Sequence, residues 1–321
     1  MKLLDLSELQ AAGELVHRTV TPTAQICWPL LSRRAGAEVW VKHENHTPIG
    51  AFKVRGGLVY MDKVKRQGGT KRVIAATRGN HGQSISFAAA RAGLGATIVV
   101  PHGNSPGKNA AMQAFGGELI EHGRDFQEAL EHAAILAGED GVTLVPSFDM
   151  ALAKGVASYA LELFYAAADL HTVYVPIGLG SGICGLISAR DALGIKTNIV
   201  GVVSENAAAY ALSFDADELI STNSADTLAD GMACRVPVAE ALEIIRAGAE
   251  RIVQVSDEQI LDAMAHYLTD THNLAEGAGA APLAALLQEK EQMAGRKVGV
   301  ILSGGNADPD LVARVLPRTA N

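Results

Sequence analysis

Lys53 has the setting in this sequence that most favours chemistry. It lies in the stretch "IGAFKVRGG", residues 49–57, with Phe52 directly before it and glycines on both sides. A lysine that is removed from water has a lowered pKa, and its neutral amine can form a Schiff base with a carbonyl compound. The alternative is a solvated lysine at the start of a helix, which is what most lysines are. Other loops must decide between the two.

A second stretch, "VYVPIGLGSGICGLISA" at 173–189, has the pattern of a strand, a glycine-rich turn and a helix. Gly178, Gly180 and Gly182 allow a bound group to approach the backbone, and Ser181 adds a hydroxyl. The free N–H groups at the start of the following helix attract an anion, so the segment predicts a phosphate cradle. An ordinary tight turn that needs glycine is the alternative.

The same glycines also match a dinucleotide-binding fingerprint. Gly180, Gly182 and Gly185 have the G-x-G-x-x-G spacing, and Glu205 follows about 20 residues later, after the next predicted strand. In that fold the acid binds a ribose hydroxyl. Taken alone, the segment would indicate an NAD-dependent oxidoreductase.

Two further loops carry polar groups that suit a small ligand. "TRGNHGQS" at 77–84 follows a predicted strand and opens a helix, so its backbone N–H groups, the Asn80 amide and the Arg78 guanidinium suit a carboxylate. "SGGN" at 303–306 ends the last strong strand, and the Ser303 hydroxyl could bond a buried heteroatom of a ligand. A capped helix with a surface arginine and an ordinary turn are the alternatives.

The elements around these loops predict an α/β fold. Short runs rich in Val and Ile alternate with alanine-rich helical stretches such as 81–93 and 126–139, which indicates parallel sheets with helices on both faces. Residues 1–15 predict an amphipathic helix, and "SDEQ" at 256–259 predicts a capping box that opens another. The predicted strands are 38–43, 72–77, 96–100, 117–122, 143–147, 172–177, 198–203, 251–256 and 297–304. Ligands of such sheets bind beyond the carboxyl ends of the strands, where all four loops lie.

Composition narrows the class of protein. Of 321 residues, 48% are hydrophobic and 19% are charged, which allows a large core. A net charge of −8 without a basic run argues against a nucleic-acid partner. Cys27, Cys184 and Cys234 are far apart and odd in number, as in a reducing compartment. We find neither a signal peptide nor an apolar run of about 18 residues, so we expect a cytoplasmic protein that does not span a membrane.

Taken in order, the loops resemble the motifs of the fold-type II pyridoxal-phosphate enzymes, and most closely those of the threonine/serine dehydratase and serine racemase family. "ENHTPIGAFKVRGG" is similar to the family's lysine motif, "TRGNHGQS" to its Ser-Gly-Asn-His loop and "PIGLGSGICG" to its phosphate loop. "LSGGN" is similar to its closing motif, and "AEGAGAA" around Glu276 to its Glu-Pro-Ala-Gly-Ala element. The resemblance covers nearly the whole chain and favours a single phosphate in the cradle over a dinucleotide.

The resemblance implies a fold and a set of roles. The fold would be two open parallel-sheet α/β domains of tryptophan synthase β-like architecture, with the active site in the cleft between them. Lys53 would be the catalytic residue, holding pyridoxal 5'-phosphate as a Schiff base and moving the substrate α-proton. Phe52 would pack beside the cofactor ring, Asn80 would hydrogen-bond its 3′ oxygen, and Ser303 would meet the ring nitrogen. The cofactor phosphate would lie on Gly178, Leu179, Gly180, Ser181 and Gly182. The substrate carboxylate would be received by Thr77, Gly79, Asn80 and His81.

These roles imply an ammonia-lyase that removes the hydroxyl of a β-hydroxy-α-amino acid and releases a 2-oxo acid plus ammonia. Threonine and serine are the default substrates. A large domain of 1–46 plus 147–321 and a small inserted domain of 47–146 are expected, as is a homodimer. Because the chain continues only a little past "SGGN", we expect no regulatory domain. An NAD-dependent oxidoreductase and a non-catalytic amino-acid-binding homologue are the alternative functions.

Departures from the family's motifs place the chain in a divergent branch. Ala51 replaces the serine before Phe-Lys, and Arg78 stands where racemases have an acid/base serine. An arginine stays protonated near neutral pH, so efficient racemisation is not expected. We hypothesise that Arg78 contacts a larger or anionic β-substituent, as in phenylserine or 3-hydroxyaspartate, or pairs with an acid to close the site.

A divalent cation site of some relatives is also altered. Val203 and Ala209 occupy positions where those relatives have carboxylate ligands, so no metal is expected there. Glu205 or Asp230 could still build a different site.

Overall fold

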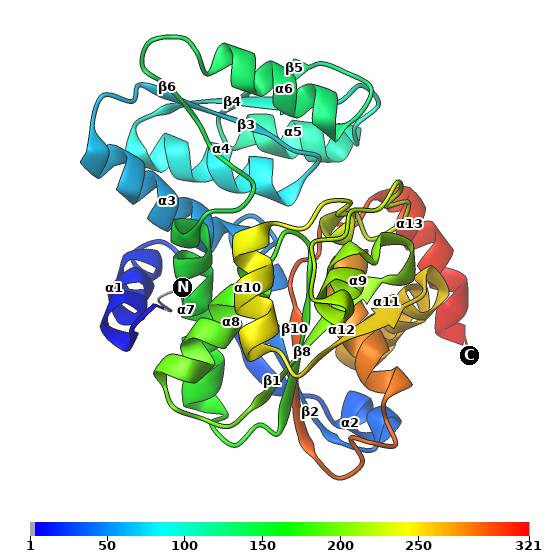
Figure 1. Cartoon of the computed structure of the whole chain (residues 1–321). Coiled ribbons are helices and arrows are strands. Elements are labelled where there is room, and N and C mark those ends of the chain that lie inside the picture. The colour runs from blue at the N-terminus through cyan, green and yellow to red at the C-terminus, as the bar shows by residue number, and fades with distance from the viewer. Residues whose placement is uncertain (1–3, 321) are drawn as a thin grey trace.

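The Val- and Ile-rich runs form two separate sheets in the computed structural model, which describes residues 4–320 (Figure 1). The larger sheet has the order β1-β2-β10-β7-β8-β9, and its strands are β1 (Gln25–Cys27), β2 (Glu38–His43), β10 (Lys297–Leu302), β7 (Thr172–Pro176), β8 (Asn198–Ser204) and β9 (Arg251–Val255). The smaller sheet has the order β5-β4-β3-β6, and its strands are β5 (Gly117–Glu121), β4 (Gly95–Val100), β3 (Arg72–Ala76) and β6 (Val142–Leu144). All nine predicted strands are therefore present, with ends that differ by up to three residues.

The short strand β1 was not predicted. It pairs antiparallel with β2, with Ile26 opposite Val41, and it forms an edge of the larger sheet. Three residues are too few for a periodic pattern, which is why the sequence does not reveal it. The other strand pairs in the described part of the chain are parallel, as predicted.

Helices connect the parallel strands and cover the sheets. They are α1 (Leu6–His17), α2 (Pro29–Ala35), α3 (Lys53–Gln67), α4 (Asn80–Ala92), α5 (Pro106–Ala114), α6 (Phe126–Leu136), α7 (Met150–Ala166), α8 (Ser181–Ala192), α9 (Ala209–Ala216), α10 (Ala239–Gly248), α11 (Asp257–Thr271), α12 (Gly277–Gln288) and α13 (Pro309–Val315). Short 3-10 helices are η1 (Glu44–His46), η2 (Glu205–Ala207), η3 (Asp230–Met232) and η4 (Leu316–Ala320). The predicted capping box is present, because the Ser256 and Gln259 side chains each accept from the other's backbone N–H. No helix within residues 4–320 combines the length and apolar character needed to cross a bilayer.

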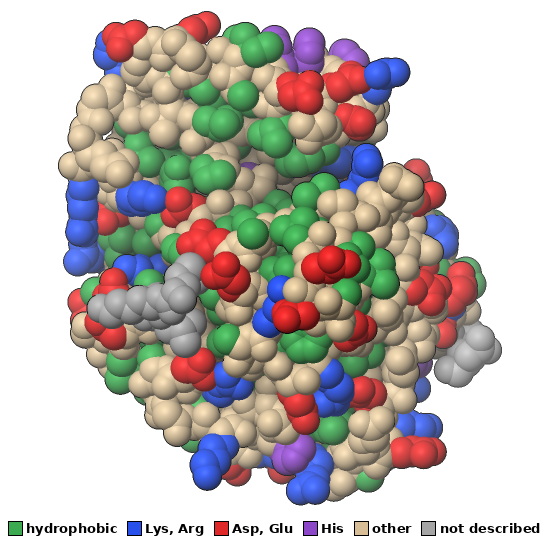
Figure 2. Space-filling model, in the orientation of Figure 1, with side chains coloured by type: hydrophobic (Ala, Val, Ile, Leu, Met, Phe, Trp, Pro, Cys, Tyr) green, Lys and Arg blue, Asp and Glu red, His purple; other side chains and the backbone are tan. Residues whose placement is uncertain are grey.

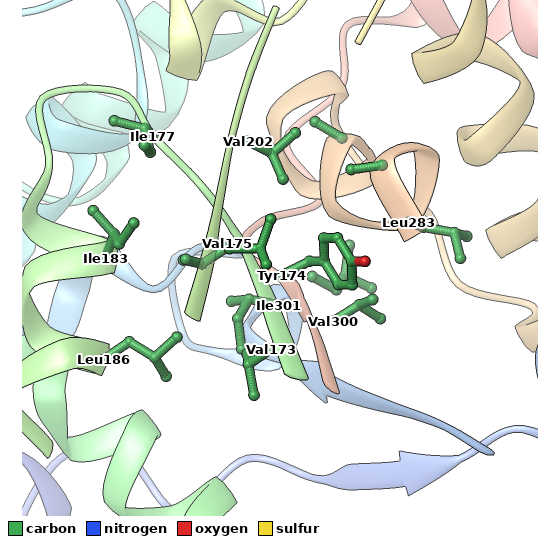
Figure 3. Packing of buried hydrophobic residues seen from close by; sticks show 14 of the residues in the cluster. Val173, Tyr174, Val175, Ile177, Ile183, Leu186, Val202, Leu283, Val300 and Ile301 are labelled. Carbon is green, nitrogen blue, oxygen red and sulfur yellow. The ribbon is translucent and has the colours of Figure 1, made fainter. Parts of the chain in front are cut away.

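The main core lies around the centre of the larger sheet. Val173 and Val175 of β7 and Val300 of β10 are buried there with Leu283 of α12 (Figure 3). β-Branched side chains suit this position because they pack well on a pleated surface. The core therefore fixes β7 and β10, whose carboxyl ends carry the glycine-rich turn and "SGGN".

The two sheets belong to two lobes. The smaller sheet, with α4, α5 and α6, forms the upper lobe of Figure 1, and the larger sheet lies in the lower lobe with helices around it. Figure 2 shows a hollow between the lobes on the same face. All strands of the upper lobe come from residues 72–144, and the small inserted domain of 47–146 stays a prediction.

Candidate active site

Lys53 is the first residue of α3, and its backbone is held from two sides. Its carbonyl accepts a 2.6 Å hydrogen bond from Ser84 Oγ of α4. The preceding residue, Phe52, donates its N–H to the Ser303 carbonyl at 3.0 Å, and Ala51 forms an isolated antiparallel bridge with Gly304. The lysine segment, "SGGN" and the start of α4 are thus joined, as predicted for a shared site.

The Lys53 amine has no partner that would hold its proton. Nζ lies 5.3 Å from the centroid of the Phe52 ring and makes no hydrogen bond or ion pair with the residues that the structure describes. Burial lowers the pKa of Lys53 to about 8, although the Glu276 charge opposes the shift. The amine therefore becomes neutral, and nucleophilic, far more readily than a solvated lysine.

Asn80 connects three loops at this point. Its Nδ2 donates to Glu276 Oε1 at 2.8 Å, and its Oδ1 accepts from Asn306 Nδ2, also at 2.8 Å. Asn306 Nδ2 also donates to the Ile49 carbonyl at 2.9 Å. One N–H of the Asn80 amide remains available for a ligand. Reasoning from the sequence placed Glu276 in a motif and assigned no role to Asn306, because neither contact is visible without the fold.

Glu276 is a half-buried residue whose carboxyl lies next to these groups. Burial raises its pKa to about 7, while the Lys108 charge and the hydrogen bond from Asn80 act in the opposite direction. Glu276 immediately precedes α12, and its backbone N–H donates to the Gly304 carbonyl at 3.1 Å. Its charge is therefore coupled to Lys53 near neutral pH.

The loop at 77–81 offers unused polar groups. Thr77 is buried, and its Oγ1 accepts from the Gly79 N–H at 3.1 Å. His81 is 8% exposed, and its Nε2 has no hydrogen-bond partner. Burial, together with the Lys53 charge, lowers the pKa of His81 to about 3, so the imidazole is neutral. A buried nitrogen without a hydrogen-bond partner destabilises the fold unless a ligand or a water molecule bonds to it.

Arg78, in the same loop, is exposed. Between residues 4 and 320 its guanidinium has neither a hydrogen bond nor an ion pair. The pairing with an acid that we considered for Arg78 is not observed, and its role toward a β-substituent stays a prediction.

The glycine-rich turn precedes α8, as predicted, and tyrosines hold it. Tyr210 donates to the Leu179 carbonyl at 2.9 Å, and Tyr159 donates to the Gly182 carbonyl at 3.2 Å. A Cβ on Gly182 would have ordinary contacts only, of 3.7 Å to the Tyr159 hydroxyl and 3.8 Å to Phe52 Cζ. The packing of the protein therefore does not require glycine there.

Gly185 and Ser303 differ in what they contact. A Cβ on Gly185 would lie 2.9 Å from the Ala157 nitrogen of α7, so this glycine serves helix packing. Ser303 is buried, and within the described chain its Oγ has no hydrogen-bond partner. Its hydroxyl is thus available to a ligand, and its contact with a cofactor ring nitrogen stays a prediction.

The two acids considered for a metal site, Glu205 and Asp230, belong to no ligand cluster in the described chain. Glu205 is exposed after β8, and Asp230 pairs with Lys108 at 2.6 Å. Val203 and Ala209 are buried hydrophobic residues. Across residues 4–320, no group of three or more His, Cys, Asp or Glu side chains is placed to hold a metal ion.

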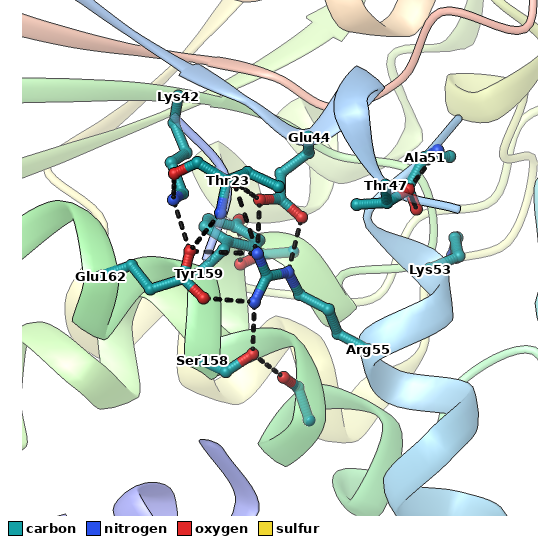
Figure 4. A network of polar contacts seen from close by, with 12 residues as sticks. Thr23, Lys42, Glu44, Thr47, Ala51, Lys53, Arg55, Ser158, Tyr159 and Glu162 are labelled. Carbon is teal, nitrogen blue, oxygen red and sulfur yellow. Dashed lines mark hydrogen bonds and ion pairs between the residues drawn. The ribbon is translucent and has the colours of Figure 1, made fainter. Parts of the chain in front are cut away.

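A buried ionic cluster lies beside the lysine helix (Figure 4). The Arg55 side chain, two residues after Lys53, is fully buried and makes paired hydrogen bonds to Glu44 (2.7 and 2.9 Å) and to Glu162 (2.6 and 3.1 Å). Arg55 also donates to Ser158 at 3.0 Å, and Lys42 pairs with Glu162 at 2.5 Å. Burial opposes the charged form of Arg55, yet the two carboxylates raise its pKa above its usual range. The cluster fixes α3 to β2, η1 and α7.

Comparison with known proteins identifies the family of the chain. Residues 16–304 match the family model described as pyridoxal-phosphate dependent enzyme. The chain is 33% identical to an L-threonine ammonia-lyase of Geobacter sulfurreducens, over 98% of this chain and 79% of the relative. It is 32% identical to a catabolic L-threonine dehydratase of Staphylococcus aureus strain USA300, over 99% of this chain and 94% of the relative.

Solved structures of two enzymes have the same fold as this chain. Threonine deaminase isoform 2 from Solanum lycopersicum has a TM-score of 0.91 and 27% identity, covering 100% of this chain and 98% of that one. Maize serine racemase has a TM-score of 0.92 and 25% identity, covering 99% and 98%.

The fold and the site define a fold-type II α/β enzyme. The chain belongs to the family of pyridoxal-phosphate-dependent enzymes, and its cofactor is pyridoxal phosphate. This membership excludes the NAD-dependent alternative built on Gly180, Gly182, Gly185 and Glu205.

The residues present fit that cofactor. Among residues 4–320 neither the Lys53 amine nor the Ser303 hydroxyl has a hydrogen-bond partner, and Gly182 leaves backbone space next to Phe52. These are the features that a group joined to Lys53 and lying along the glycine-rich turn requires.

Proposed function

We propose that this protein is a pyridoxal-phosphate-dependent ammonia-lyase that converts a β-hydroxy-α-amino acid to a 2-oxo acid and ammonia. The observation that carries the proposal is the Lys53 amine, which is unpaired and has a pKa lowered to about 8 at the meeting point of four loops. The names of the curated relatives, threonine ammonia-lyase and threonine dehydratase, support this reaction class.

The cofactor would be held by residues from both lobes. Lys53 would bind it covalently, Phe52 would pack on its ring, and Ser303 would donate its hydroxyl to the ring nitrogen. The free N–H of Asn80 would reach the 3′ oxygen. The phosphate would be bound by Gly178, Leu179, Gly180, Ser181 and Gly182. When bound, pyridoxal phosphate supplies an electron-withdrawing ring that stabilises negative charge at the substrate α-carbon.

The substrate would be positioned by the loop at 77–81. Thr77, Gly79, Asn80 and His81 would receive its carboxylate through backbone N–H groups and the unused His81 nitrogen. The freed Lys53 amine would take the α-proton, and the β-hydroxyl would leave as water. Uptake of one water then releases ammonia, so the overall reaction turns threonine into 2-oxobutanoate and ammonia with atoms balanced.

Threonine and serine are the default substrates of this proposal. Arg78 leaves a free guanidinium at the loop, which favours testing 3-hydroxyaspartate and phenylserine as well. A permanently charged arginine is a poor acid/base group, so we expect little racemisation.

Spectroscopy and a product assay test the proposal. The purified protein should show the visible absorbance of lysine-bound pyridoxal phosphate, which borohydride should abolish. Lys53→Ala should lack the reducible band. A coupled 2-oxo acid assay with the four candidate amino acids should detect turnover of at least one. A cofactor-loaded protein that turns over none of them would instead support a non-catalytic amino-acid-binding homologue.

We also propose a homodimer in the cytoplasm. The family resemblance supports the first, and the three free cysteines of the described chain support the second. Light scattering on the purified protein tests the dimer.

A further inference from the structure

Lys108 of α5 joins the two lobes across the site. Its ammonium lies 2.6 Å from Asp230 Oδ2 of η3 and 3.3 Å from Asp308 Oδ2, just before α13. On the same side, Ser105 Oγ donates to Asp308 Oδ1 at 2.6 Å. The Lys108 side chain is only 12% exposed, although it belongs to a helix of the upper lobe and both acids belong to the lower lobe.

Both acids lie next to loops that would hold the cofactor. These two cofactor loops are the glycine-rich turn and "SGGN". Asp230 precedes Gly231, whose carbonyl oxygen would lie 2.2 Å from a Cβ on Gly178, so the two backbones touch at the glycine-rich turn. Asp308 follows Asn306 by two residues, and Asn306 holds the Asn80 amide.

Lys108 itself lies beside the loop at 77–81. Its Cδ would lie 3.4 Å from a Cβ on Gly79, in the loop at 77–81. The Lys108 charge also acts on Glu276, the carboxylate that orients Asn80. One side chain thus lies beside the loop at 77–81, pairs with acids that adjoin the glycine-rich turn and "SGGN", and influences Glu276.

We propose that Lys108 is a positioning residue that holds the substrate loop at 77–81 against the two cofactor loops and so closes the site around the substrate. The inference rests on the proposed function only in assigning the substrate carboxylate to that loop. Isolated surface ion pairs contribute little to stability. A nearly buried ammonium that pairs with two carboxylates instead orders the segments that carry these three groups.

Hydrogen–deuterium exchange of the holoenzyme tests the proposal. In Lys108→Met, peptides covering 77–84 and 227–233 should exchange roughly 5- to 30-fold faster. This is the change in the opening equilibrium that we expect when one such ion-pair network is lost. Lys63→Met is the matched control. It removes a 2.9 Å ion pair between Lys63 of α3 and Asp149 before α7, which touches none of the site loops. Exchange in both segments should stay unchanged in this control and be largely restored in Lys108→Arg.

Kinetics provide the second readout. Lys108→Met should keep the visible absorbance of the bound cofactor but raise KM for the amino acid more than it lowers kcat. If Lys108→Met does not fold, Asp230→Asn, at an exposed partner, should give the same exchange pattern. Unchanged exchange in both segments, or acceleration spread evenly over the protein, would overturn the proposal. Because exchange needs no turnover, an inactive wild-type protein would refute the proposed function and leave this inference standing.

Discussion

The side-chain amide of Asn80 donates to the Glu276 carboxylate at 2.8 Å, and this contact brings together residues from the two lobes. It places a carboxylate whose pKa burial raises to about 7 close enough to act on the Lys53 amine, whose pKa burial lowers to about 8. The two groups therefore titrate in neighbouring pH ranges, and each charge influences the other.

The uptake of cofactor should depend on the charge of Lys53. Only the neutral amine attacks the aldehyde of pyridoxal phosphate, so the rate of uptake by cofactor-free protein should rise as pH increases through about 8. The Glu276 charge favours protonated Lys53, so Glu276→Gln should move this midpoint to lower pH. Stopped-flow absorbance over a pH series measures both. A wild-type midpoint near the ordinary lysine value of 10.5 would contradict the prediction.

Gly182 and Gly185 should respond differently to alanine. Gly182→Ala should leave the free energy of unfolding unchanged or raise it by up to about 1 kcal/mol, because the protein has room for the methyl group. It should weaken cofactor binding at least about 10-fold, since the methyl group would enter the space of the phosphate. Gly185→Ala should instead cost about 1–3 kcal/mol of stability, because its Cβ would press on α7. Urea denaturation and cofactor titration separate the two effects, and equal cofactor affinity in Gly182→Ala and wild type would refute the cradle.

Arg55 should matter for stability far more than an exposed ion pair does. Arg55→Met leaves Glu44 and Glu162 buried with only part of their compensation, and should cost about 3–5 kcal/mol. Lys63→Met, at a partly exposed pair also made by α3, should cost less than about 1 kcal/mol. Adding Glu44→Gln to Arg55→Met should recover part of the loss, because it removes one buried charge. Urea denaturation measures the free energy of unfolding of each variant. Similar decreases in Arg55→Met and Lys63→Met would contradict the proposed role of the cluster.

Arg78 should influence substrate choice more than cofactor binding. If its free guanidinium meets an anionic β-substituent, Arg78→Ser should lower kcat/KM for 3-hydroxyaspartate about 10- to 100-fold, the value of a charge-assisted hydrogen bond. The same variant should change kcat/KM for threonine by less than about threefold, because threonine offers no second anion. The coupled 2-oxo acid assay measures both, and an equal effect on all substrates would remove Arg78 from the specificity of the site.

The sequence predicted the elements better than the contacts between them. Continuous Val and Ile runs identify the buried strands, and glycine-rich loops after those strands identify the ligand-binding edge, because both signals are local. The ion pair of Lys108 is not local, since Asp230 lies 122 residues further along the chain. The bond between Asn80 and Glu276 spans 196 residues. Such partners become visible only when the two lobes are placed together.

The position of β10 has a consequence for how the chain is made. β10 is the last strand in the described sequence, yet it lies in the interior of the larger sheet, between β2 and β7. While the ribosome is still translating, β2 and β7 therefore have no common neighbour and expose unpaired edges. The smaller sheet is complete once residue 144 has emerged, whereas the larger sheet must wait until β10 has emerged at residue 302. We expect the nascent chain to carry a folded upper lobe beside an unfinished lower lobe, with most of its exposure to aggregation falling in that interval.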